Sequence, residues 1–123
     1  MIQKICEQAG KYGCLVFSYL YCIGIDGIEA VKMYDRLVFK KIIDEDFYVL
    51  DGDKLLSEFG SSKRVARLAQ APENKLYIQC WKNEKTGHSH YVVMKNNEVA
   101  YDPLGESVTC RDGEPTDDIR IVM

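Results

Sequence analysis

The stretch HSHYVVMKNNEVAYDP, residues 88–103, decides the fold of the second half of the chain. HSHYVVMK alternates in character and is rich in residues that favour strands, and EVAYD follows it across an Asn-Asn turn. Two such runs separated by a short turn are typical of an antiparallel hairpin. The sequence therefore predicts two paired strands here, with both histidines at the start of the first.

Further strands are expected on both sides of this hairpin. KLYIQCW at 75–81 indicates a buried strand, SVTC at 107–110 a short one, and DIRIVM at 118–123 the last one. KRVARLAQAP at 63–72 is compatible with a strand or a short helix. The acidic stretch DGEPTDD at 112–118 is predicted to be a solvated cluster of turns.

The first half of the chain predicts helices. CLVFSYLYCI at 14–23 is apolar almost all round, which favours a buried helix. A second helix is expected at 27–39 and a third at 52–59, with a short extended piece at 47–50 between them. Helices followed by strands predict an α+β fold with an antiparallel sheet, in a single domain of residues 1–123.

Composition and charge exclude several classes of protein. The net charge of −3 disfavours binding to nucleic acid, because phosphate contacts need a basic surface. No apolar run is long enough to span a membrane and MIQKICEQ is no signal peptide, so a cytoplasmic protein is expected. Five cysteines without a CxxC pair predict neither a disulfide framework nor a zinc site. No cofactor is expected, and the pair His88 and His90 is the one remaining hint of a metal site.

Cys14 is a candidate nucleophile because it stands at the expected start of a helix. A helix start favours the thiolate, and a nearby histidine would complete the pair. In the hairpin, His90 and Asp102 can lie on the same face of the sheet under either of two conditions. The loop has an odd number of residues, such as the three from Lys95 to Asn97, or one strand contains a bulge. A plain two-residue turn would put Asp102 on the wrong face. His88 lies two residues nearer the preceding turn and is the less favoured base.

The order of these residues resembles that of the papain-like cysteine peptidases. Gln8 precedes Cys14 by six residues, and the phrases HYVVM from His90 and YDPLG from Tyr101 are closest to the bacteriocin-processing, double-glycine leader peptidases and their free-standing relatives. The resemblance implies a papain-like fold with N-terminal helices packed on a C-terminal antiparallel sheet. It also implies that Cys14 is the nucleophile, His90 the base, Asp102 the residue that orients His90, and Gln8 the oxyanion donor together with the backbone N–H of Cys14.

The sequence is compatible with two functions. The first is a bacterial or phage thiol hydrolase that cleaves a peptide or amide bond through an acyl-enzyme intermediate. The second is an inactive binding or regulatory protein on the same fold, encoded by a phage or mobile element and acting on a protein partner. Each candidate residue taken alone also has an ordinary structural explanation, such as a buried cysteine or a histidine packed on a sheet.

Overall fold

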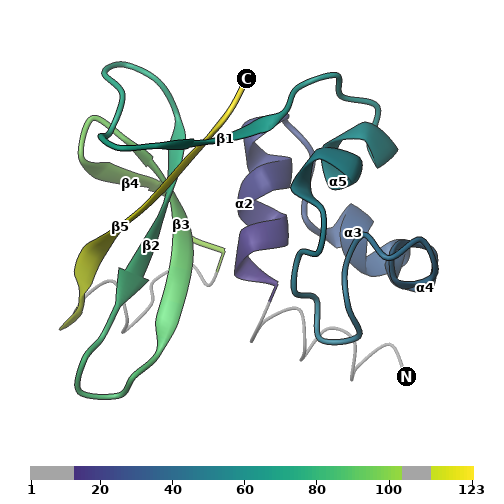
Figure 1. The fold of residues 1–123 in the computed structure, drawn as a ribbon, viewed down its shortest axis with the longest axis horizontal. Helices are drawn as coiled ribbons and strands as arrows, with labels where there is room; N and C mark the ends of the chain where they lie inside the picture. The colour runs from purple at the N-terminus through teal and green to yellow at the C-terminus, as the bar shows by residue number, and fades with distance from the viewer. Residues whose placement is uncertain (1–12, 104–111) are drawn as a thin grey trace.

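The computed structural model describes residues 13–103 and 112–123, which form an α+β fold (Figure 1). The described helices are α2 (Cys14–Cys22), α3 (Ile28–Lys32), α4 (Tyr34–Phe39) and α5 (Gly52–Glu58). The described strands are β1 (Val65–Leu68), β2 (Tyr77–Lys82), β3 (Ser89–Lys95), β4 (Glu98–Tyr101) and β5 (Glu114–Val122). The described helices precede the described strands in the sequence, as predicted, and the predicted α+β class is confirmed.

All five strands form one antiparallel sheet in the order β1-β5-β2-β3-β4. The last strand in the sequence, β5, therefore lies inside the sheet, between β1 and β2. The ambiguous segment at 63–72 contributes β1 and is a strand. The short strand expected at 107–110 lies outside the described residues.

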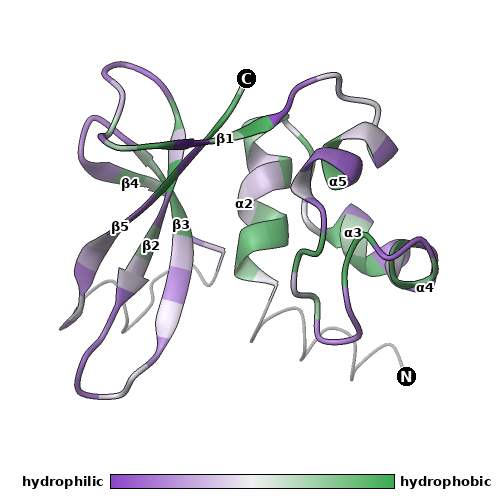
Figure 2. Ribbon diagram, in the orientation of Figure 1, coloured by the Kyte–Doolittle hydropathy of each residue, from purple (hydrophilic) through white to green (hydrophobic). Residues whose placement is uncertain are grey.

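The helices cover one face of the sheet, and α2 is the helix that packs directly against β3 (Figure 1). Val16, Tyr19 and Leu20 of α2 are buried against the sheet residues Ile78 and Val93. The hydropathy colouring shows that much of α2, which runs beside the sheet, is hydrophobic (Figure 2). This contact fixes the helix that begins at Cys14 to the strand that carries His90.

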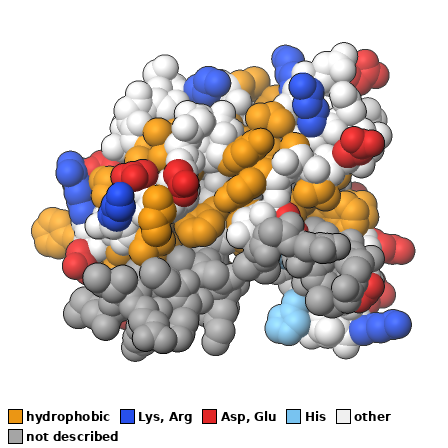
Figure 3. Space-filling model, turned by 180° about the vertical axis from the view of Figure 1, so that it is seen from behind, with side chains coloured by type: hydrophobic (Ala, Val, Ile, Leu, Met, Phe, Trp, Pro, Cys, Tyr) orange, Lys and Arg blue, Asp and Glu red, His pale blue; other side chains and the backbone are white. Residues whose placement is uncertain are grey.

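The opposite face of the sheet carries a second, smaller apolar cluster. Tyr77, Val92, Met94 and Ile119 are buried in it, with Trp81 packed against them. Successive strand residues face opposite sides of a sheet, which explains why Val92 and Val93 belong to different clusters. Seen from behind, the surface also shows a band of hydrophobic side chains between charged ones (Figure 3).

The second helix is interrupted where the sequence predicts a continuous one at 27–39. The chain breaks at Met33, whose N–H donates to the carbonyl oxygens of both Glu29 and Ala30 at 3.2 Å. Such a shared bond tightens the last turn of a helix, so α3 ends there and α4 starts anew. The third helix is confirmed, and Asp51 caps it by accepting a hydrogen bond from the N–H of Lys54 at 3.0 Å.

The prediction of a turn cluster at 112–118 is wrong, because β5 already begins at Glu114. Polar groups hold this part of the strand in the sheet. Thr116 Oγ1 donates to the carbonyl oxygen of Cys80 at 2.8 Å, and Gln79 Nε2 donates to the carbonyl oxygen of Thr116 at 2.9 Å. These bonds lie where the register between β2 and β5 shifts, so side chains replace the regular ladder at this irregularity.

Candidate active site

Cys14 is the first residue of α2, as predicted from the sequence. Gly13 precedes it as the N-cap, and the side chain of Cys14 is half-buried. The first N–H groups of a helix have no partner within it, and they carry the positive end of the helix dipole. A thiolate at this position would be stabilised by that dipole.

Burial nevertheless disfavours the thiolate of Cys14. Burial raises its pKa, and this effect outweighs the hydrogen bonds from the backbone of Tyr91 and Leu15, which act in the opposite direction. A neutral thiol is a weak nucleophile, so attack on a carbonyl needs a base that takes its proton.

The contact with Tyr91 places Cys14 beside the main chain of β3, one residue after the candidate base, while the His90 side chain lies on the face of the sheet opposite α2. Tyr91 directly follows His90 in β3, so the sulfur of Cys14 lies within hydrogen-bonding reach of the main chain beside His90. The side chain of Tyr91 faces the core beneath α2, whereas His90 shares the face of Val92 and Met94 by the alternation of the strand. Within the part of the chain that the structure describes, no hydrogen bond joins the Cys14 sulfur to the imidazole.

His90 and Asp102 form a buried pair. His90 Nε2 lies 2.6 Å from Asp102 Oδ1, and each side chain is only 5% exposed. A carboxylate on one ring nitrogen fixes the tautomer and the orientation of the ring. Because Nε2 is bound to Asp102, Nδ1 is the nitrogen left to exchange a proton with another group.

The hairpin reaches this geometry through a bulge and not through a longer loop. The expected three-residue loop is wrong: Lys95 pairs with Glu98 across a two-residue turn of Asn96 and Asn97. Both asparagines have positive φ, 52° and 66°, which a tight hairpin turn of this kind requires.

A shift of register between β3 and β4 then reverses which face of the sheet the later residues of β4 point to. Met94 pairs with Val99 and Val93 pairs with Tyr101, so one extra residue lies on β4. The extra residue returns Asp102 to the face of His90, as the predicted alternative of a bulge requires.

His88 lies in a different place from His90. It is exposed, and it lines a pocket of about 410 Å³ together with Cys14, Tyr48, Tyr91 and Arg120. His88 therefore stays a second candidate base, close to the thiol but without the buried carboxylate partner that His90 has.

A network in the wall of this pocket was not found from the sequence. Arg120 donates to Asp118 through Nε and Nη2, to the Tyr91 hydroxyl through Nη2 at 3.2 Å, and to the Tyr19 hydroxyl through Nη1 at 2.8 Å. Tyr91 also donates to Asp118 Oδ2 at 2.7 Å. Burial opposes the charge on Asp118, but the bonds from Arg120 and Tyr91 outweigh burial and lower the pKa of this carboxyl.

The remaining predictions concern Gln8, metals and membranes. Gln8 lies outside the described residues. In residues 13–103 and 112–123, no group of three or more histidine, cysteine or carboxylate side chains is arranged to hold a metal ion. No helix in these ranges is long and apolar enough to cross a membrane.

Comparison with known proteins gives a family but no described activity. No curated protein matches the chain, and no solved structure matches it. A family model with the description "protein of unknown function, DUF261" matches residues 2–121, which is nearly the whole sequence. The chain therefore belongs to the DUF261 family.

Proposed function

We propose that this protein is a papain-like thiol hydrolase that cleaves a peptide or amide bond with Cys14, His90 and Asp102. The observation that carries the proposal is the buried His90–Asp102 pair, 2.6 Å long, beside the main chain that Cys14 contacts at the start of α2. A buried ionisable pair is costly to desolvate and adds little stability compared with apolar packing. A catalytic role would account for such a pair in a strand whose main chain contacts a cysteine at a helix start.

The proposed reaction follows from the chemistry of these groups. The Cys14 sulfur attacks the carbonyl carbon while its proton passes to His90 Nδ1, and Asp102 holds the charged ring through Nε2. Because the His90 side chain lies on the face of β3 turned away from α2, this transfer requires the imidazole and the thiol to approach each other around the strand. His90 then protonates the departing amine as the C–N bond breaks, which leaves a thioester on Cys14. Water, deprotonated by His90, cleaves the thioester and restores the thiol. By the resemblance, Gln8 and the Cys14 backbone N–H would bind the oxyanion, and one such donor is worth about 3 kcal/mol.

One observation favours a second candidate, a binding or regulatory protein without catalysis. Burial raises the pKa of Cys14, the His90 side chain lies on the sheet face opposite α2, and no hydrogen bond links the Cys14 sulfur to an imidazole in the described residues. An unused cysteine next to a structural ion pair would show the same features. Catalytic hydrogen bonds are often absent before substrate binds, so the two candidates are separated by reactivity.

The first experiment measures alkylation by iodoacetamide, with the adducts located by peptide mapping across a range of pH. Cys22 is the internal control, since it is also half-buried and burial raises its pKa to about 11. The hydrolase predicts that Cys14 reacts near neutral pH much faster than Cys22. Equal, slow labelling of the two cysteines would support the binding protein instead.

Two histidine variants identify the base. His90→Ala should slow the labelling of Cys14 by at least about tenfold, because general-base assistance is lost. His88→Ala is the matched control and should leave the rate unchanged. Dependence on His88 and not on His90 would contradict the role assigned to the His90–Asp102 pair.

A second experiment tests the covalent intermediate. p-Nitrophenyl acetate should acetylate Cys14, detected by mass spectrometry, and the adduct should disappear as water turns it over. In Asp102→Asn the adduct should form and decay more slowly, since the ring is no longer held in the active tautomer. An adduct that forms but never decays would argue against a hydrolase.

A further inference from the structure

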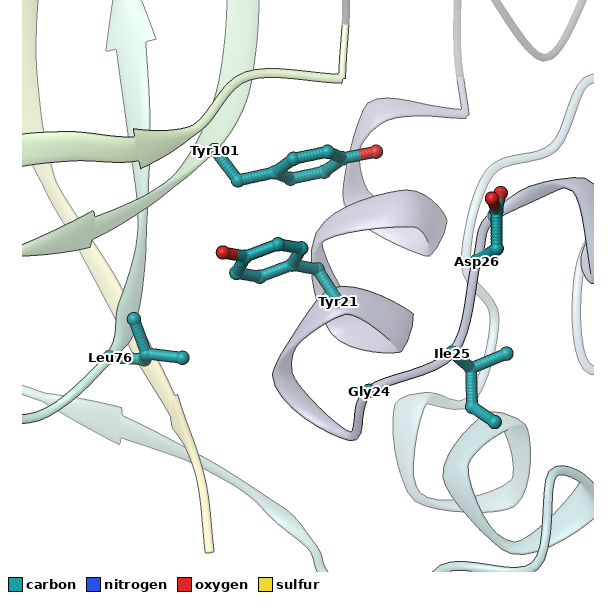
Figure 4. A pocket seen from close by; sticks show the side chains of 7 residues that line it. Tyr21, Gly24, Ile25, Asp26, Leu76 and Tyr101 are labelled. Carbon is teal, nitrogen blue, oxygen red and sulfur yellow. The ribbon is translucent and has the colours of Figure 1, made fainter.

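A second pocket, of about 460 Å³, lies at the other end of α2 from Cys14 (Figure 4). The end of α2, the loop that follows it and the sheet residue Leu76 form its walls. Tyr101 contributes from β4, and Ile25 and Asp26 contribute from the loop. None of these residues is used by the proposed hydrolase, so the pocket needs its own explanation.

Two tyrosines form the aromatic wall of the pocket. Tyr21 and Tyr101 stack with ring centroids 4.4 Å apart and planes inclined by 6°. Tyr21 remains 39% exposed, so the pair is open to solvent and is not closed into the core. In the close view the Tyr101 hydroxyl points toward the loop that carries Asp26, whereas the Tyr21 hydroxyl points the opposite way.

Asp26 supplies the charge among the described residues of the pocket. Among the described residues that line the pocket, Asp26 is the one carboxylate and none is a lysine or arginine. Its Oδ1 accepts a hydrogen bond from the N–H of Ile28 at 3.0 Å, and in the described residues no cationic side chain pairs with it. Burial raises the pKa of Tyr101, and the charge of Asp26 raises it further, so the field of this carboxylate reaches the aromatic wall.

We propose that this pocket binds an organic cation on an apolar stem, either the side chain of lysine or arginine in a peptide or a free alkylamine. The stacked rings cover each other's inner faces, so a cation would be attracted to their outer faces, where the Asp26 carboxylate adds a full opposite charge. Ile25 and Leu76 offer apolar surface for the methylene stem of such a group. The net charge of −3 on the chain favours the approach of cations.

The experiment uses the full chain and matched probes, followed by NMR titration and calorimetry. A short blocked peptide with a central lysine is compared with the same peptide carrying norleucine, which has the stem without the ammonium group. Spermidine is the free-amine probe. The lysine peptide or spermidine should bind more tightly than the norleucine peptide, shift the resonances of Tyr21 and Tyr101, and weaken as salt is added.

The variant Asp26→Asn removes the charge and keeps an oxygen that can accept the bond from Ile28. It should weaken cation binding by about fivefold, while Glu29→Gln, a neighbouring carboxylate outside the pocket, should leave the affinity unchanged. Cys14→Ser should also bind normally, which separates this proposal from the hydrolase. If the norleucine peptide binds as well as the cations, or if Asp26→Asn binds them like the wild type, the proposal is wrong. Absence of cation binding at millimolar concentration overturns it as well.

Discussion

The hydroxyl of Tyr19 accepts a 2.8 Å hydrogen bond from Nη1 of Arg120, which joins the middle of α2 to β5. The same guanidinium lies over the ring of Tyr91, with its carbon 5.1 Å from the ring centroid. Arg120 therefore holds three elements together: the helix that begins at Cys14, the strand that carries His90, and the strand that closes the sheet. The orientation of α2 relative to β3 depends on this one side chain as well as on apolar packing.

The variant Arg120→Met should lower the free energy of unfolding by about 1–3 kcal/mol, because Asp118 would keep its charge in a partly covered site without a cation. Urea denaturation at neutral pH measures the change. The control is Arg36→Met, which removes a 2.7 Å ion pair whose arginine is 61% exposed, and which should cost less than about 1 kcal/mol. Equal losses in the two variants would show that the Arg120 network adds nothing beyond an ordinary surface pair.

The pH dependence of stability should depend on Cys22. Burial raises its pKa to about 11 in the folded protein, whereas an unfolded cysteine titrates near pH ~8.5. A raised pKa in the folded state stabilises the protein fully below the unfolded value, and that contribution is lost as the pH rises toward the folded value. Between about pH 8 and pH 10.5, the wild type should therefore lose more stability than Cys22→Ala. Parallel pH profiles of the two proteins would contradict the assigned shift.

The turn between β3 and β4 offers a test of the register that places Asp102. Asn97 has a φ of 66°, so glycine should fit this position without strain and valine should not. Asn97→Gly should keep the stability within about 1 kcal/mol of the wild type or raise it, and Asn97→Val should lower it by more than about 1 kcal/mol. Thermal unfolding measures both variants. A harmless valine would mean that this turn is not the one described.

Much of the fold follows from local patterns in the sequence. The buried strand β2, the hairpin and the helix from Cys14 were predicted because apolar periodicity and turn residues agree in each of them. The break at Met33 was missed because its apolar spacing continues unbroken through α3 and α4. The start of β5 was missed because Glu114 and Asp117 indicate solvent, whereas backbone bonds to β2 keep this acidic stretch in the sheet.

The candidate site could be predicted only in part. Parity along a strand, together with a bulge, is enough to bring His90 and Asp102 to one face, and their contact was expected on that basis. The partners of Arg120 lie up to 101 positions away in the sequence, so no local pattern points to them. The alternation in DIRIVM puts Asp118 and Arg120 on one face, which was the available signal for that network.

The place of β5 inside the sheet sets the order in which the protein can be completed during synthesis. β1 has β5 as its neighbour in the sheet, although β2, β3 and β4 all leave the ribosome before β5 does. The edges of β1 and β2 that β5 later occupies are therefore unpaired in the nascent chain, and unpaired edges are where chains associate wrongly. The sheet is therefore complete only after β5 has been made. β5 also carries Arg120, whose hydrogen bond to Tyr19 connects it to α2, the helix that begins at the candidate nucleophile.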